Sequence, residues 1–431
     1  MNPILLASKS KKPLALLKRA RGISQRYGFT PIQMEKALER FIELLKQFDC
    51  GATFPITAFI LGRYSRNFSR YLDQNIEFAV HGLTHVDYSQ LAPKVQLTQL
   101  QQAIKIFGQA GISPTGFRSP YLSRNENLRK SLEKTGFSYV SNQPIMWDAI
   151  DPNALTSSVI GNYEHVLNFY DPWKACDRLS LPLLEDKLVE IPVSLPDDEI
   201  LIDRLGGENE LVKKAWLCIL RQTYLQGELF TLQLHPERIN ICAEALEEVL
   251  AEAKALAPAV WCARLDEIAA WWKARSGATL EITKINEKGY HFSVSGPNGI
   301  NVLVREVEID APTIPWNGGY RTVKELQFIS KGTIKPIIGI SSSTSKVLSR
   351  FLQQQGYFIE VGQEPERYTF YFDQVYFDVT QEKIILDQIE ESGCPLIRLG
   401  RWPNGNQSAL AITGDIDALS IWDYILRMVE R

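Results

Sequence analysis

The chain has 431 residues, of which 45% are hydrophobic, and its formal net charge is −3. This length exceeds what one hydrophobic core usually serves, so two domains are expected. The small net charge gives no electrostatic case for binding nucleic acid or an anionic membrane surface, and the apolar runs are far shorter than a membrane span requires.

The N-terminal sequence and the cysteines both favour a cytoplasmic location. Residues 1–22 lack a basic start followed by an apolar stretch, so no secretory signal is expected. The six cysteines are scattered without a CxxC spacing. This usage favours reduced thiols over a disulfide framework or a cysteine-bound zinc.

From residue 30 to about 275, helix-like and strand-like segments alternate. Helical spacing of apolar residues predicts helices at 30–48, 92–110, 125–136, 242–256 and 264–277. Short apolar runs predict strands at 51–61, 75–83, 112–121, 137–142, 189–196 and 227–237. Strands separated by helices indicate an α/β fold with a parallel sheet or a (β/α) barrel.

The pattern changes at about residue 278. Residues 280–309 alternate apolar and polar side chains between turn signals, which predicts an antiparallel meander. Helices are expected at 341–356 and 380–393, with strands resuming at 367–379. We therefore expect a separate α+β domain here.

Two of the five histidines, His81 and His85, lie four residues apart directly after the strand expected at 75–83. If the chain turns helical there, this spacing aims both imidazoles the same way. Such a pair is half of a metal site, which would take a carboxylate as third protein ligand and keep an open position. Coincidence is the alternative, but the carboxyl end of a strand is where α/β folds carry active sites.

Two further candidates also come after expected strands. Arg118 precedes Pro120 and Tyr121, which predict a rigid turn, and its guanidinium could orient a carboxylate. Taken alone, Arg118 fits a surface ion pair better. His235 ends the strand expected at 227–237, where a histidine suits a general acid, although a lone histidine there is more often structural.

Near the end of the chain, an apolar strand-like segment at 409–414 runs into Asp415 and Asp417. Side chains two apart on an extended segment point to the same side, so both acids could face one site. Alternatively, they cap the helix expected at 420–431, with Asp417 or Ser420 as the natural cap. Capping would not explain why an apolar strand leads into both acids.

Taken in order, three motifs resemble those of the NodB-homology polysaccharide deacetylases. VHGLTH at 80–85, FRSPY at 117–121 and LQLHPE at 232–237 are similar to the HxxxH, RxPY and Leu-x-His motifs of that family. The resemblance covers roughly residues 30–275. The Asp-Asp motif that opens family members is absent from residues 1–50, and AITGDID at 411–417 resembles its Asp-x-Asp variant. The resemblance therefore implies a deacetylase with its first motif circularly permuted to the C-terminus.

The resemblance also implies a metal centre. Zn²⁺, or another divalent ion, would be held by Asp417, His81 and His85, and would lower the pKa of a bound water. Asp415, oriented by Arg118, would take the proton of that water. Which of the two aspartates is base and which is ligand is assigned by analogy with the family.

The remaining expected roles complete an amide hydrolysis. His235 would protonate the leaving amine, and the backbone N–H of Tyr121 would help to stabilise the oxyanion. Trp147 and Leu234 either line the pocket or belong to the core. Residues 197–198 form a charged segment that is expected on a solvated rim loop, outside the site.

The expected fold is thus α/β, a (β/α) barrel-like domain of the distorted, seven-stranded type with a smaller inserted α+β domain. Its main part would be 1–277 and its insertion 278–402, and 403–431 would return to complete the barrel. The expected reaction removes an N-acyl group, an N-acetyl group above all, from a carbohydrate or a related small amide. Homo-oligomers are compatible with the sequence.

Two other functions remain open at this point. One is a catalytically silent glycan-binding or interaction protein. The other is a 2-His-1-carboxylate Fe(II) oxygenase, which would leave Arg118 and His235 without a role.

Overall fold

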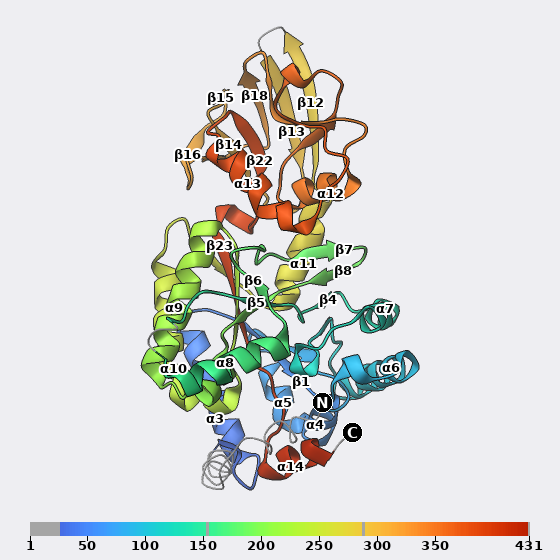
Figure 1. Ribbon diagram of the computed structural model, residues 1–431, viewed down its shortest axis with the longest axis vertical. Helices are drawn as coiled ribbons and strands as arrows, with labels where there is room; N and C mark the ends of the chain where they lie inside the picture. The colour runs from blue at the N-terminus through green and yellow to red at the C-terminus, as the bar shows by residue number, and fades with distance from the viewer. Residues whose placement is uncertain (1–25, 152–154, 287–288, 430–431) are drawn as a thin grey trace.

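The structure is a computed structural model that describes residues 26–151, 155–286 and 289–429. A larger α/β body and a smaller, strand-rich body lie one above the other along the long axis (Figure 1). Each has its own hydrophobic clusters. Among the described residues, none of the helices combines the length and apolar character of a membrane span.

The larger body is built on a nine-stranded sheet. Its strands are β1 (Ala52–Ile56), β2 (Ile76–Val80), β3 (Gly116–Phe117), β4 (Tyr139–Val140), β7 (Leu183–Glu185), β8 (Leu188–Glu190), β10 (Leu229–Gln233), β11 (Val260–Cys262) and β23 (Ser408–Thr413). The pairing order is β10–β23–β1–β2–β3–β4–β8–β7, and β11 also pairs with β23. All pairs are parallel except the β7–β8 hairpin.

Strand β23 lies in the middle of this sheet although it comes last in the chain. It runs between β10 and β1, with Thr413 aligned with Gln233 on one side and with Thr53 on the other. The pairing continues beyond the strand, where Ile416 bridges Ile56. All six residues of β23 are buried, as a strand in the middle of a parallel sheet requires.

The sheet curls toward a ring, but no strand pairing closes this ring among the described residues. A small parallel sheet of β6 (Trp173–Lys174), β5 (Pro144–Met146) and β9 (Val193–Leu195) brings the chain back to β10. The backbone N–H of Thr231 donates to Ser194 Oγ at 3.3 Å, yet no ladder joins β9 to β10 in the described ranges. Strand β9 is short and is followed by Pro196, which has no N–H to donate. The expected seven-stranded barrel is thus an open ring among these residues.

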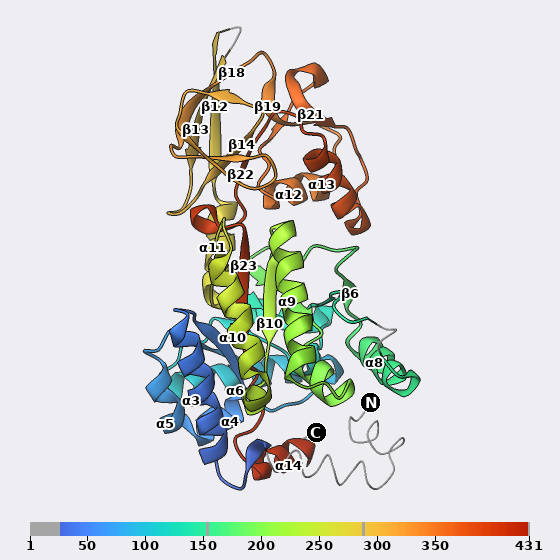
Figure 2. The same ribbon diagram turned by 90° about the vertical axis from the view of Figure 1, so that its left-hand side faces the viewer.

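Helices cover this ring, and their bounds are close to those expected wherever a helix was predicted. They are α3 (Ile32–Gln47), α4 (Ala58–Arg63), α5 (Ser65–Phe68), α6 (Pro93–Gln109), α7 (Glu126–Thr135), α8 (Ser157–Tyr170), α9 (Asn209–Gln226), α10 (Ile239–Ala255), α11 (Leu265–Ser276) and α14 (Ile421–Val429). Helices α3, α9 and α10 lie on the side that faces the viewer in Figure 2.

The structure corrects one expected strand. The sequence predicts a strand at 51–61, but β1 stops at Ile56 and α4 comes next. The first N–H groups of α4, those of Ala58 and Phe59, donate to the carbonyl oxygens of Gly82 and Leu83 at 2.9 and 3.0 Å. These bonds satisfy the free donors of a helix start, so the apolar run continues as a helix.

The smaller body contains three sheets. Their strands are β12 (Thr279–Asn286), β13 (Gly289–Ser295), β14 (Val302–Arg305), β15 (Glu308–Ile309), β16 (Thr313–Pro315), β17 (Arg321–Val323), β18 (Gln327–Lys331), β19 (Lys335–Ile340), β20 (Ile359–Val361), β21 (Tyr368–Phe372) and β22 (Leu396–Leu399). Two sheets are antiparallel, ordered β12–β13–β18–β15 and β16–β17–β14–β22. The third, β20–β19–β21, is parallel and is accompanied by α12 (Lys346–Gln354) and α13 (Glu382–Glu391).

Candidate active site

Four parallel strands carry the predicted polar residues to one edge of the sheet. His81 lies just after β2, Arg118 after β3, His235 after β10 and Asp415 after β23. Because the carboxyl ends of parallel strands meet at the same edge, these side chains converge although they are far apart in the sequence.

A loop, not a helix, brings His81 and His85 together. The segment does not turn helical, because residues 81–87 form bends and extended links. The N–H of His81 still donates to Ile56 at 2.9 Å, and Gly82 then adopts φ +84°, which glycine accepts without strain. The two imidazole centroids end 5.2 Å apart.

Asp417 completes a three-residue cluster with these histidines. Its Oδ1 lies 3.4 Å from His81 Nε2 and 3.3 Å from His85 Nε2. This oxygen is buried, and among the described residues it has no hydrogen-bond partner. A buried, unsatisfied carboxylate oxygen costs free energy unless another group binds it. One donor atom from each residue lies within 4.8 Å of the others.

Both imidazoles can present a lone pair to this point. His81 Nδ1 lies 2.8 Å from the carbonyl oxygen of Arg118, and because a carbonyl only accepts, Nδ1 carries the proton and Nε2 is free. Burial lowers the pKa of His85 to about 4, so its ring is neutral near pH 7. Two imidazoles and a carboxylate suit Zn²⁺ and related divalent ions. The residues present therefore fit a divalent metal ion.

The other oxygen of Asp417 is paired with Arg427 of α14. Burial disfavours the charged carboxylate, but the guanidinium of Arg427 opposes this effect, and the pKa of Asp417 lies well below its usual range. Asp417 therefore does not cap the terminal helix. That role belongs to Ser420, whose backbone N–H donates to Asp423 at 3.0 Å and whose Oγ accepts from the Asp423 N–H.

Asp415 is held between two donors beside this cluster. Arg118 Nη1 donates to its Oδ1 and Gln233 Nε2 donates to its Oδ2, each at 3.0 Å. Arg118 is fully buried, and it also donates to Thr413 Oγ1 and to both oxygens of Ser141. The surface ion pair considered for Arg118 is thus wrong. Asp415 Oδ2 lies 3.9 Å from His81 Nε2.

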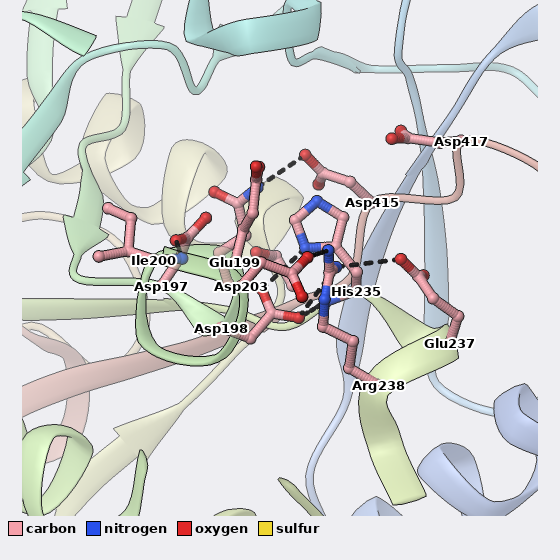
Figure 3. A network of polar contacts seen from close by, with 12 residues as sticks. Asp197, Asp198, Glu199, Ile200, Asp203, His235, Glu237, Arg238, Asp415 and Asp417 are labelled. Atoms are coloured by element: carbon pink, nitrogen blue, oxygen red, sulfur yellow. Dashed lines mark hydrogen bonds and ion pairs between the residues drawn. The ribbon is translucent and has the colours of Figure 1, made fainter. Parts of the chain in front are cut away.

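His235 is held by a carboxylate that was expected to be solvated. Its Nδ1 lies 2.7 Å from Asp198 Oδ1, and its backbone N–H donates to Asp198 Oδ2 at 2.8 Å. Asp197 and Asp198 are both buried, so the expected solvated rim loop is wrong. Figure 3 shows this group beside Asp415.

The raised pKa of His235 results from this pairing. Burial disfavours the imidazolium, but the Asp198 carboxylate overcomes it and raises the pKa of His235 well above its ordinary value. On its far side, Asp198 approaches Arg238 Nη1 at 3.4 Å, and Arg238 Nη2 donates to Asp203 at 2.8 Å. The charges thus alternate from buried His235, Asp198 and Arg238 outward to Asp203 and compensate one another.

The other predicted residues lie around this centre. Tyr121 has φ +61°, a conformation that is rare for a residue with a bulky side chain, and its ring packs on His85 with 4.7 Å between centroids. Trp147 and Leu234 are both buried within the hydrophobic core. The backbone N–H of Leu234 donates to Thr413 at 2.9 Å, which ties β10 to the strand that carries Asp415.

Three site residues were missed from the sequence. Gln233 lies two positions before His235 on β10, so the period of a strand could have placed it on the same side. Asp198 comes after β9 at the same edge of the ring, but a charged pair in a loop is usually solvated. Arg427 is ten positions beyond Asp417 on a helix, and no sequence signal linked the two.

Comparisons with known proteins point to one family. Residues 29–140 match the family model for polysaccharide deacetylase. Peptidoglycan deacetylase-like protein FGM2 of Gibberella zeae is 33% identical over 102 residues, which are 22% of this chain and 30% of that protein. The chain thus spans less than a third of the length of this curated relative.

Two solved structures are similar to part of this chain. A Mycobacterium smegmatis protein assigned as a polysaccharide deacetylase is 22% identical, over 54% of this chain and 76% of its own, with a TM-score of 0.42. Puue Allantoinase is 19% identical, over 55% of this chain and 72% of its own, with a TM-score of 0.43.

Proposed function

We propose that this protein is a metal-dependent amide hydrolase that removes an N-acyl group, an N-acetyl group above all, from a carbohydrate or a related small amide. One observation carries the proposal: the unsatisfied oxygen of Asp417 lies 3.4 and 3.3 Å from two imidazole nitrogens. The match of residues 29–140 to the polysaccharide deacetylase family supports the same chemistry.

We also propose that the chain is a circular permutant of that family. The family match ends at residue 140, and both aspartates of the site come from the far end of the chain. Strand β23 leads into both aspartates and pairs with β1 and β10. This is the place that the first strand of a barrel would take, between its second and last strands.

In this mechanism His81, His85 and Asp417 would hold the divalent ion. Such an ion polarises the substrate carbonyl and lowers the pKa of a bound water. Asp415 accepts the proton of the attacking water, and its two hydrogen bonds, from Arg118 and Gln233, keep it oriented.

His235 then protonates the leaving amine. Its raised pKa keeps the imidazolium populated at neutral pH, and Asp198 fixes its orientation through Nδ1, so that Nε2 carries the proton to be donated. The backbone N–H of Tyr121 donates to the developing oxyanion. The left-handed backbone at this residue is the kind of strain that folds retain at functional positions.

Hydrolysis by the purified full chain tests this function. Acetate release is measured from N-acetylglucosamine and its oligomers, and ring opening is measured for a cyclic ureide, each with Zn²⁺ and after chelation. We expect hydrolysis that chelation abolishes and that Asp415→Asn lowers by at least about 10²-fold, while Asp310→Asn, in the smaller body, leaves it unchanged.

Three outcomes would contradict the proposal. Turnover that survives chelation would exclude the metal mechanism. Glycan binding without turnover would favour the silent module. Oxygen consumption with bound Fe²⁺ would favour the oxygenase.

A further inference from the structure

The C-terminal helix α14 turns its charged residues toward the protein. Asp423 is 3% exposed and pairs with Arg63 at 2.7 Å. Four residues later, on the same side of the helix, Arg427 reaches Asp417. The inner side of this helix is therefore polar, the reverse of a surface helix that packs on an apolar core.

The outer side of α14 is apolar instead. Trp422, Ile425 and Leu426 are 58%, 41% and 39% exposed, and the neighbouring Phe29 and Ile32 are 71% and 57% exposed. The rings of Phe29 and Trp422 lie 6.5 Å apart, and the N–H of residue 421 donates to the carbonyl of residue 28 at 2.9 Å. We call these five residues the α14 face. Contiguous apolar surface of this kind marks a contact site.

The chain enters the described structure beside this face. Arg26 is bound to Asp203, with N–O distances of 3.0 and 2.7 Å, and the ring of buried Tyr27 lies 5.3 Å from that of Tyr424. The point from which residues 1–25 extend is thus fixed next to α14. At about 3.3 Å per extended residue, these residues are long enough to cross the whole α14 face.

The composition of residues 1–25 complements what lies beside them. They include eight Leu, Ile and Met residues and six Lys and Arg residues, with no Asp or Glu. When these six cations are removed from the net charge of −3, the rest of the chain is left with −9. The negative charge of the rest of the chain attracts the basic segment. An anionic lipid surface would repel this negatively charged part of the protein.

We propose that residues 1–25 dock on the α14 face and clamp the C-terminal helix to the protein. The short tether gives the segment a high local concentration at the face, which a second copy of the chain lacks. A terminal helix without such a cover would fray, and α14 is the element that comes directly after Asp415 and Asp417. The docking is independent of what the site hydrolyses.

Hydrogen exchange on the full chain tests the clamp. In a variant carrying Leu14→Ser, Leu16→Ser and Leu17→Ser, we expect the amides of residues 421–429 to exchange at least about tenfold faster, with β1 unchanged. Trp422→Ser with Leu426→Ser should in turn speed exchange within residues 1–25. The matched control is Val375→Ser with Tyr376→Ser, two exposed residues of the smaller body, which should change neither.

Unchanged exchange in both variants would overturn the proposal. So would a dimer that becomes monomeric on Trp422→Ser while residues 1–25 exchange as before, because the face would then bind a second copy. Cosedimentation with vesicles of equal parts phosphatidylglycerol and phosphatidylcholine that Trp422→Ser abolishes would assign the face to a lipid surface instead.

Discussion

At the scale of single residues, neighbouring charged groups raise the pKa of His235 and orient Asp415 for the proposed mechanism. Burial alone would leave His235 neutral and a poor proton donor, but Asp198 reverses this effect. Asp415 receives two hydrogen bonds that hold it toward the cluster of His81, His85 and Asp417. The site therefore keeps its acid protonated and its base oriented, and both groups are buried.

The Asp198–His235 pair predicts a specific pH dependence. In Asp198→Asn, burial is no longer opposed, so the pKa of His235 should fall. The alkaline limb of the kcat/KM profile should move to lower pH, and kcat should fall by about 10²-fold. The imidazole titration, followed by NMR, should show the same shift.

Stability should depend on pH in the same sense. The folded-state pKa of His235 is raised, so the pair stabilises the wild type fully below about pH 6.5 and loses this contribution as the pH rises through the raised pKa. The destabilisation caused by Asp198→Asn should therefore be larger at pH 6 than above that pKa. An Asp198→Asn enzyme with an unchanged alkaline limb would contradict the pairing.

Among the secondary-structure elements, strand β23 and the extended segment after it position the acids. The sequence predicts this strand from its apolar run, and the structure has it at Ser408–Thr413. The packing around Gly414 is closer than a strand pattern can reveal. A Cβ on Gly414 would lie 2.7 Å from Phe54 Cε1 and 3.0 Å from the Leu234 carbonyl oxygen, so only glycine lets the backbone pass between β1 and β10.

Gly414→Ala is therefore expected to displace Asp415. The overpacking should cost about 1–3 kcal/mol in the free energy of unfolding, and kcat/KM should fall by at least about tenfold because the base is misplaced. Gly108→Ala is the control, since nothing lies within 4 Å of its new Cβ. Denaturant unfolding and acetate release measure both effects, and equal behaviour of the two variants would contradict the close approach.

Other elements show which features the sequence pattern could predict and which it could not. Regular periodicity predicted helices such as α3, α6 and α11 within a few residues. The loop that brings His81 and His85 together has no such period, and its shape depends on Gly82 and on backbone bonds to a different strand. The parallel sheet β20–β19–β21 also escaped prediction, because its pairing is set by tertiary contacts.

In the molecule as a whole, the two ends of the described chain meet. The N–H of Ile421 donates to Gly28 at 2.9 Å, and Tyr27 packs on Tyr424, with both ends at the same pole in Figure 1. Circular permutation is tolerated when termini lie close together. The order of the motifs is visible in the sequence. Only the structure shows the ring of strands that brings them together.

Reversing the proposed permutation should preserve the fold. A chain that starts at residue 403, runs to 431 and continues through a Gly/Ser linker of about ten residues into 1–402 restores the motif order of the family. We expect its unfolding free energy to stay within about 2 kcal/mol of the wild type, with metal binding retained. A reordered chain that is folded by circular dichroism but binds no metal would contradict the permutation.

In the proposed site, His81 and His85 share one metal ion with Asp417, which lies near the other end of the sequence. The decisive experiment is to measure the zinc content and affinity of the full chain, by mass spectrometry and competition with a chelator, in wild type, His81→Ala, Asp417→Asn and the control His291→Ala. We expect about one ion per chain in the wild type and the control, and an affinity loss of at least about 10²-fold in the other two. Equal zinc affinity in wild type and Asp417→Asn would show that the acids of the C-terminal segment do not bind the ion.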